Sequence, residues 1–152
     1  NLSYEQFKEL LVKHGIKTVI DVRSSPYSRY ITWANRETLR AALRADGFQY
    51  VYGGSVLGGR AAYTFDSELF QQKMDRVVEV HSKSPSVMIC AEKSPQQCHR
   101  AFKLTHYLHT AEPTLKINHI LGMKEGVIDS REFSSLQKEN WPFGVDSIKT
   151  TT

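Results

Sequence analysis

Disulfide-forming cysteines, a membrane-spanning run and a secretion signal are scarce or missing in this sequence. Its 152 residues include two cysteines, which are too few for a disulfide scaffold. No apolar run approaches the ~20 residues that a membrane-spanning helix needs. The first residues, Asn1 to Glu5, have neither the basic segment nor the apolar segment of a signal peptide. We therefore expect a cytoplasmic protein with reduced thiols and no membrane partner.

An excess of charge of either sign is also small. The formal net charge is +4 and the isoelectric point is about 9.1, which mildly favours anionic partners. Such an excess supplies few contacts to a phosphate backbone. We therefore expect a small anionic ligand and at most weak, non-specific binding of nucleic acid. The sequence indicates no cofactor and no particular oligomeric state.

What the sequence does contain is an alternation of short β-branched runs with amphipathic helical patterns, in a chain of ordinary globular composition. Strands are expected around Val19, Val51, Ile89 and Ile117. The helices between them are expected to begin after the N-cap residues Ser3, Asn35, Thr64 or Asp66, and Ser94. This alternation predicts an α/β fold, with a mainly parallel sheet that carries helices on both faces. We expect a single three-layer domain over residues 1–152, with weak structural signals after about residue 123.

The expected site is organised around one stretch, Val87–Arg100. The stretch begins as an apolar strand and continues into a helix with Ser94 as its N-cap and Pro95 at its first position. The residues Cys98–Arg100 then fall in or just beyond the first helical turn. Binding sites of α/β proteins lie at this place, where the carboxyl end of a strand meets the amino end of a helix.

Three residues of this stretch are candidates for catalysis: Cys98, His99 and Glu92. The positive end of the helix dipole and the neighbouring basic residues favour a thiolate at Cys98. Glu92 and His99 have the chemistry of a general acid and a general base. Two plainer interpretations stay open: Cys98 packs on the same helical stripe as Ala101, and Glu92 only occupies the turn. Zinc is not favoured, because Cys90 and Cys98 lack the usual spacing of zinc ligands.

A second group of residues is suited to holding an anion at the carboxyl ends of the strands. Its members are arginines, glycines and one carboxylate: Asp21, Arg23, Arg29, Gly58, Gly59, Arg60 and Arg100. Guanidinium groups bind phosphate through paired hydrogen bonds, and glycines let backbone approach a ligand or merely let a loop turn. Each arginine alone can be a solvated surface residue, and Asp21 can be the counter-ion of Arg23 or Arg100. We favour a ligand, because Asp21 and Glu92 do not balance three or four arginines.

The loop from Arg23 to Ala34 holds three large aromatic residues, Tyr27, Tyr30 and Trp33, around Arg29. Aromatic rings next to a cation are suited to stacking on nucleobases. The same rings can instead pack the loop onto the sheet, which we regard as the commoner arrangement. Both interpretations of the aromatic residues stay open.

Several of these motifs together resemble the family known as domain of unknown function 488. The matching residues are Asp21-Val22-Arg23, Pro26, Ser28, Arg29, Leu57-Gly58-Gly59, Cys90-Ala91-Glu92, Pro95, Cys98-His99-Arg100 and His119-Ile120. The Asp-Val-Arg piece alone also looks like the opening of rhodanese domains. The resemblance implies a compact α/β domain, largely of prokaryotic occurrence, with no assigned activity. Members usually have a strand before the first helix, which this sequence lacks, and often a histidine where it has Tyr52.

Three functions are compatible with these patterns. The first is an enzyme that acts on a phosphate-bearing or nucleotide-like substrate at the arginine and cysteine site. The alternative is a nucleic-acid-binding module that uses the same arginines and the loop aromatics without catalysis. The third is a structural domain, for which we expect a closed ion-pair network between Asp21 and Arg100 and no open pocket.

Overall fold

The computed structural model describes residues 2–58, 67–90, 99–114, 117–120 and 127–129. It divides into two compact units, Asn1–Ala91 and Glu92–Thr152, and each is described by itself. The expectation that both belong to a single domain stays a prediction. In the part of the chain that the structure describes, no helix combines the length and the apolar character needed to cross a membrane.

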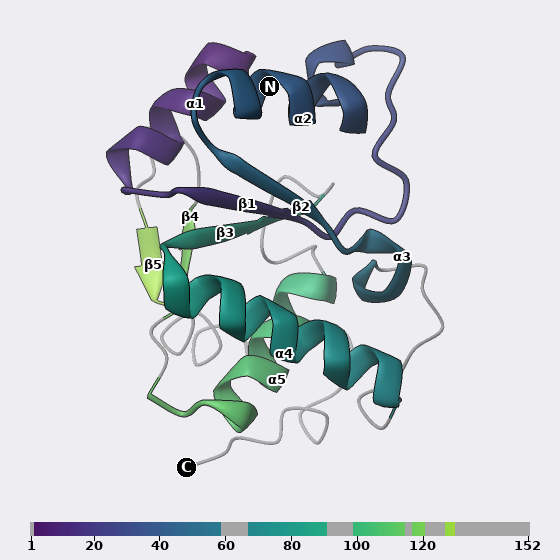
Figure 1. Ribbon diagram of the computed structural model, residues 1–152, viewed down its shortest axis with the longest axis vertical. Coiled ribbons are helices and arrows are strands. Elements are labelled where there is room, and N and C mark those ends of the chain that lie inside the picture. The colour runs from purple at the N-terminus through teal and green to yellow at the C-terminus, as the bar shows by residue number, and fades with distance from the viewer. Residues whose placement is uncertain (1, 59–66, 91–98, 115–116, 121–126, 130–152) are drawn as a thin grey trace. The chain divides into compact units, whose positions relative to one another are not determined.

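The first unit is a three-layer α/β arrangement. Its elements are α1 (Tyr4–Lys13), β1 (Thr18–Asp21), the 3-10 turn η1 (Thr32–Ala34), α2 (Arg36–Ala45), β2 (Gln49–Tyr52), α3 (Gly54–Leu57), α4 (Glu68–Lys83) and β3 (Ser86–Ile89). The strands lie in the order β2-β1-β3 and all neighbours are parallel. Helices α1 and α2 cover one face of the sheet and α4 the other (Figure 1). The predicted α/β class, parallel sheet and helices on both faces are confirmed.

The ends of α1 follow directly from its sequence. The Ser3 hydroxyl accepts a hydrogen bond from the Gln6 amide at 3.2 Å, and the Gln6 side chain accepts one from the Ser3 amide at 2.9 Å. This reciprocal pair satisfies two amide groups that a helix start leaves free. The helix ends before Gly15, whose φ of +66° is in the left-handed region that glycine adopts without strain.

Alternation along β1 decides what each face of the sheet carries. Val19 packs against Leu11, Leu39 and Leu43 from α1 and α2, within one hydrophobic cluster. Asp21 lies two residues further along β1, so it faces the same side as Val19, at the carboxyl end of the strand. This placement brings a carboxylate that is 0% exposed to the end of a buried apolar strand.

The structure corrects two local predictions in the first unit. The glycine-rich stretch after Tyr52 is not only a loop, because Gly54–Leu57 forms the short helix α3 with its apolar residues buried. Helix α4 begins after Ser67 rather than after Thr64 or Asp66, and the Ser67 hydroxyl accepts a hydrogen bond from the Phe70 amide at 3.4 Å. Serine, threonine and aspartate are all good N-caps, so their identities did not decide between neighbouring positions.

The second unit contains α5 (His99–Ala111), β4 (Asn118–Ile120) and β5 (Val127–Asp129). Strands β4 and β5 form an antiparallel pair, with His119 opposite Ile128. This corrects the expectation that the strand around Ile117 is one more parallel member of the main sheet. The predicted helix start at Ser94 lies outside the described residues.

Candidate functional site

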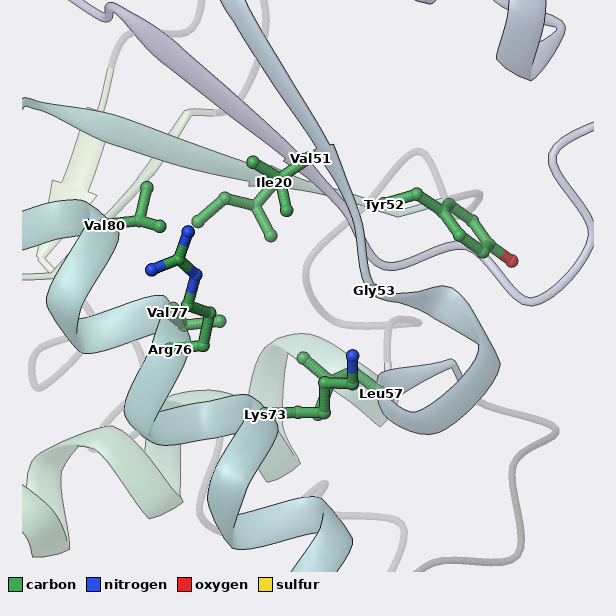
Figure 2. Close-up of a pocket in the computed structure, with 9 residues that line it drawn as sticks. All are labelled: Ile20, Val51, Tyr52, Gly53, Leu57, Lys73, Arg76, Val77 and Val80. Carbon is green, nitrogen blue, oxygen red and sulfur yellow. The ribbon is translucent and has the colours of Figure 1, made fainter.

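The candidate site lies at the carboxyl ends of β1 and β2 in the first unit. The parallel register places Asp21 beside Tyr52 and Val19 beside Tyr50. Because side chains alternate along a strand, Asp21, Tyr50 and Tyr52 face the same side of the sheet. Figure 2 shows the opposite side, where Ile20 and Val51 are directed toward α4 and the Tyr52 ring extends away from that helix.

Asp21 is the centre of the hydrogen-bond network at this site. Its Oδ1 accepts bonds from the backbone amide of Arg23 at 3.1 Å and from Arg23 Nε at 2.9 Å. Its Oδ2 accepts bonds from Arg23 Nη2 at 2.7 Å and from the Tyr50 hydroxyl at 2.5 Å. The carboxylate is fully buried and the Arg23 side chain is only 11% exposed. Of the two candidate arginine partners, it is Arg23 that the structure brings to Asp21.

The electrostatics of the network are those of a charged pair shielded from water. Burial lowers the pKa of Arg23, but its hydrogen bonds and charge interaction with Asp21 outweigh this and raise the pKa above its usual value. Burial and the hydrogen bond to Asp21 raise the pKa of Tyr50. Both groups therefore keep their protons: Arg23 stays cationic and Tyr50 stays a neutral donor to the carboxylate.

Replacing Tyr50 with phenylalanine should lower the free energy of unfolding by about 1–2 kcal/mol at neutral pH, because Asp21 loses a buried donor. A pKa raised in the folded state means that this contribution is present below the ordinary tyrosine pKa of 10.0 and is lost as pH rises above it. The difference between wild type and Tyr50→Phe should therefore be constant from pH 7 to pH ~9.5 and shrink above pH ~10. Urea unfolding of both proteins across this range measures it, and a difference that grows above pH ~10 would contradict the assignment.

Arg36, at the first position of α2, is the second cation of the site. Its guanidinium lies over the ring of Tyr52, 4.1 Å from the ring centre. The Tyr52 hydroxyl donates to the backbone carbonyl of Arg23 at 3.0 Å, which fixes the ring beside the Asp21 network. Arg36 Nε is buried, and the described residues supply it with no hydrogen-bond acceptor. Its nearest carboxylate, Glu37 Oε1, is 3.8 Å away, beyond hydrogen-bond distance.

The loop between β1 and α2 is tied to the start of α2. The Pro26 carbonyl accepts a bond from the Arg36 amide at 2.9 Å, and the Asn35 side chain accepts one from the Ser28 amide at 2.6 Å. Trp33 packs against aromatic rings of α1, so the packing interpretation holds for this residue. It does not hold for Tyr27, which is 66% exposed, or for Tyr30, which is 93% exposed.

Two glycines of the site provide close approach, but within the chain itself. A Cβ atom at Gly54 would collide with the backbone carbonyl of Arg23, and one at Gly58 would collide with Ser24. The glycines therefore let α3 press against the loop that follows β1. Gly59 and Arg60, which we grouped with Gly58, lie outside the described residues.

The structure describes only some of the predicted site residues. Glu92 and Cys98 lie outside the described residues. His99 and Arg100 begin α5 in the second unit, and their side chains are not described. Arg29 is exposed in the loop after β1. Their expected convergence with Asp21 and Arg23 stays a prediction.

A small cavity lies on the other side of the sheet, between β2 and α4 (Figure 2). It holds about 50 Å³, and its walls are mainly apolar side chains with Lys73 and Arg76 of α4 at its border. This volume suits one or two water molecules rather than a substrate. The cavity therefore does not replace the Asp21 and Arg36 cluster as the candidate site.

Sequence reasoning missed two residues of the cluster, Tyr50 and Arg36. Tyr50 shares the parity of Tyr52, but its contact with Asp21 depends on the register between β1 and β2, which the sequence does not define. Arg36 did carry a signal. A cation at the first position of a helix is unfavourable next to the positive end of the helix dipole. Its presence there indicates another role.

Comparison with known proteins places part of this chain in context. Residues 3–68 match the profile of the family described as domain of unknown function DUF488. The match covers α1 to α3 and includes Asp21, Arg23, Arg36, Tyr50 and Tyr52, so the resemblance drawn from the sequence is confirmed over these residues. Neither a curated protein nor a solved structure matches the chain.

Proposed function

Since the matched family carries no function in its description, we propose from the geometry that this rim of the first unit binds a small phosphate-bearing molecule. One observation carries the proposal. Arg36 is held over Tyr52, and its buried Nε has no hydrogen-bond acceptor among the described residues. A buried donor without an acceptor is costly, and a phosphate oxygen is the acceptor that a guanidinium binds best.

The balance of charge supports the same proposal. Arg23 already has a full partner, because both oxygens of Asp21 are hydrogen bonded to it. Arg36 lies near enough to the same network to lower the pKa of the Tyr50 hydroxyl in opposition to Asp21, as Arg23 does. One buried carboxylate thus faces two guanidinium groups, and the exposed Arg29 adds a third cation on the adjoining loop. The excess positive charge favours an anion.

The proposal divides the roles among the arginines. Asp21 and Arg23 fix the loop, and Arg36 and Arg29 contact the anion. For an enzyme, we keep Cys98, His99 and Glu92 as the candidate reactive groups, with Arg100 and the glycines before Arg60 as further contacts. That assignment depends on the sequence pattern at the start of α5 and on its approach to the first unit.

The Arg36→Gln variant should bind inorganic phosphate about 10- to 100-fold more weakly than wild type, because a charge-assisted contact contributes about 1.5–3 kcal/mol. Its own stability should fall by less than about 1 kcal/mol, because an exposed cation–π pair contributes little. Titration calorimetry with phosphate, together with thermal unfolding at rising phosphate concentration, measures both. Wild type should gain about 2.7 kcal/mol at a phosphate concentration of 100 Kd.

Arg40→Gln is the matched control. Arg40 lies one turn further along α2, is 42% exposed against 38% for Arg36, and pairs with the same Glu37, at 3.2 Å. It should bind phosphate as wild type does. Equal weakening by Arg36→Gln and Arg40→Gln would show a general charge effect and remove the site. Phosphate that never protects wild type against heat would remove it as well.

A further inference from the structure

We infer that the ligand of this site is a nucleoside phosphate, whose base stacks on the ring of Tyr27. The inference rests on the proposed phosphate site at Arg36 and names the part of the ligand that the arginines do not recognise. It starts from the exposed aromatic side chain of Tyr27, which the packing of the first unit does not use.

The backbone on both sides of Tyr27 is held in place. The carbonyl of Pro26, a buried residue, accepts the hydrogen bond of the Arg36 amide at 2.9 Å. The amide of Ser28 donates to the Asn35 side chain at 2.6 Å. Tyr27 is therefore an exposed ring on a fixed backbone, and a ligand that stacks on it orders little of the protein. Preorganised aromatic rings of this kind are efficient binding surfaces.

Tyr27 is also next to the proposed phosphate site. The residue before it is hydrogen bonded to the first residue of α2, whose guanidinium covers the Tyr52 ring. Burial, the charge of Asp21 and the Tyr27 hydroxyl all raise the pKa of Tyr52, so the two hydroxyl groups are within electrostatic range. A molecule anchored by phosphate at Arg36 therefore has an aromatic ring beside it.

A nucleoside phosphate matches both features. Its phosphate group suits the guanidinium, and each nucleobase has a flat face that stacks on tyrosine. The cavity of about 50 Å³ beside α4 is too small for a base, so stacking on the exposed ring is the mode that the first unit offers. Stacking on one face recognises an aromatic base without selecting among bases.

The test compares two probes that differ in the base, adenosine 5′-monophosphate and ribose 5-phosphate, by titration calorimetry on the full chain. Wild type should bind adenosine 5′-monophosphate about 10- to 100-fold more tightly, as one stacked base implies. Tyr27→Ala should remove this advantage and leave the affinity for ribose 5-phosphate unchanged. Tyr27→Trp should preserve the advantage. Tyr30→Ala is the matched control from the same loop and should change neither affinity.

The outcomes separate this inference from the proposed function. Equal affinity of wild type for the two probes would overturn the base contact while the phosphate site stands. A loss of affinity in Tyr30→Ala instead of Tyr27→Ala would overturn the assignment of the ring. Failure of both probes to bind would overturn the phosphate site itself. Much tighter binding of a single-stranded oligonucleotide, with a steep salt dependence, would replace the inference with a nucleic-acid-binding module.

Discussion

Replacing Asp21 with asparagine should lower the free energy of unfolding by about 3–5 kcal/mol, because it removes one charge of a buried ion pair and leaves the other. Asp21 is 0% exposed and the Arg23 side chain 11% exposed, so water compensates little for the loss. An asparagine amide group would also present a donor where the carboxylate accepts from Arg23 and Tyr50. Urea unfolding of wild type and variant, followed by circular dichroism, measures the change.

Asp46→Asn is the matched control for this substitution. Asp46 also accepts a hydrogen bond from a tyrosine, Tyr4, at 2.7 Å and pairs with Lys8 at 3.4 Å, but at the surface. Because exposed ion pairs contribute little to stability, Asp46→Asn should leave the unfolding midpoint near that of wild type. A small effect at Asp21, no larger than at Asp46, would show that the buried network does not hold the loop.

The Gly54→Ala variant should be destabilised by about 3 kcal/mol, at the upper end of what overpacking costs. The added Cβ would collide with the backbone carbonyl of Arg23 and come within 2.7 Å of the Tyr52 hydroxyl. Both atoms belong to the hydrogen bond that fixes Tyr52 under Arg36. The substitution should therefore also weaken phosphate binding, which calorimetry measures alongside the unfolding free energy.

Gly53→Ala provides the comparison for Gly54→Ala. A Cβ at Gly53 would meet only the end of the Leu57 side chain, at 3.4 Å, which is an ordinary packing distance. Its effect on stability should be within about 1 kcal/mol, since no backbone atom must move. If Gly54→Ala is as mild as Gly53→Ala, the close approach of α3 to the loop after β1 is not a requirement of the fold.

The features of the fold that could be predicted are those determined by local sequence. The capping box of Ser3 and Gln6, the helix end at Gly15 and the β-branched run of β1 each depend on a few neighbouring residues. The parallel order followed from the alternation of such local patterns. These predictions needed no knowledge of which strands are neighbours.

The features that could not be predicted depend on contacts between distant segments. Helix α3 forms in a stretch rich in glycine, a poor helix former, because Val56 and Leu57 are buried. The antiparallel pairing of β4 with β5 has no counterpart in the local pattern around Ile117. Tertiary packing outweighs propensity in the first case and defines the partner strand in the second.

The candidate site shows the same division. Asp21 and Arg23 were predicted because they end a strand in a sequence where parallel strands meet at one rim. Arg36 and Tyr50 were missed, because their contacts depend on the register of β2 and on the start of α2. The exposure of Tyr27 could not be predicted either, since the sequence equally favours a ring packed onto the sheet.

The central claim, that Arg36 binds the phosphate of a ligand, is tested most directly at its Nε–H group by nuclear magnetic resonance. The Arg36 signal is assigned as the arginine Nε–H resonance that disappears in Arg36→Lys. On titration with inorganic phosphate, this resonance should shift in a saturable way, because an anion supplies the acceptor that the described residues do not. The Nε–H resonance of Arg40 should stay in place. Saturable binding of phosphate elsewhere on the chain with no change at Arg36, or parallel shifts of Arg36 and Arg40 that never saturate, would contradict the account.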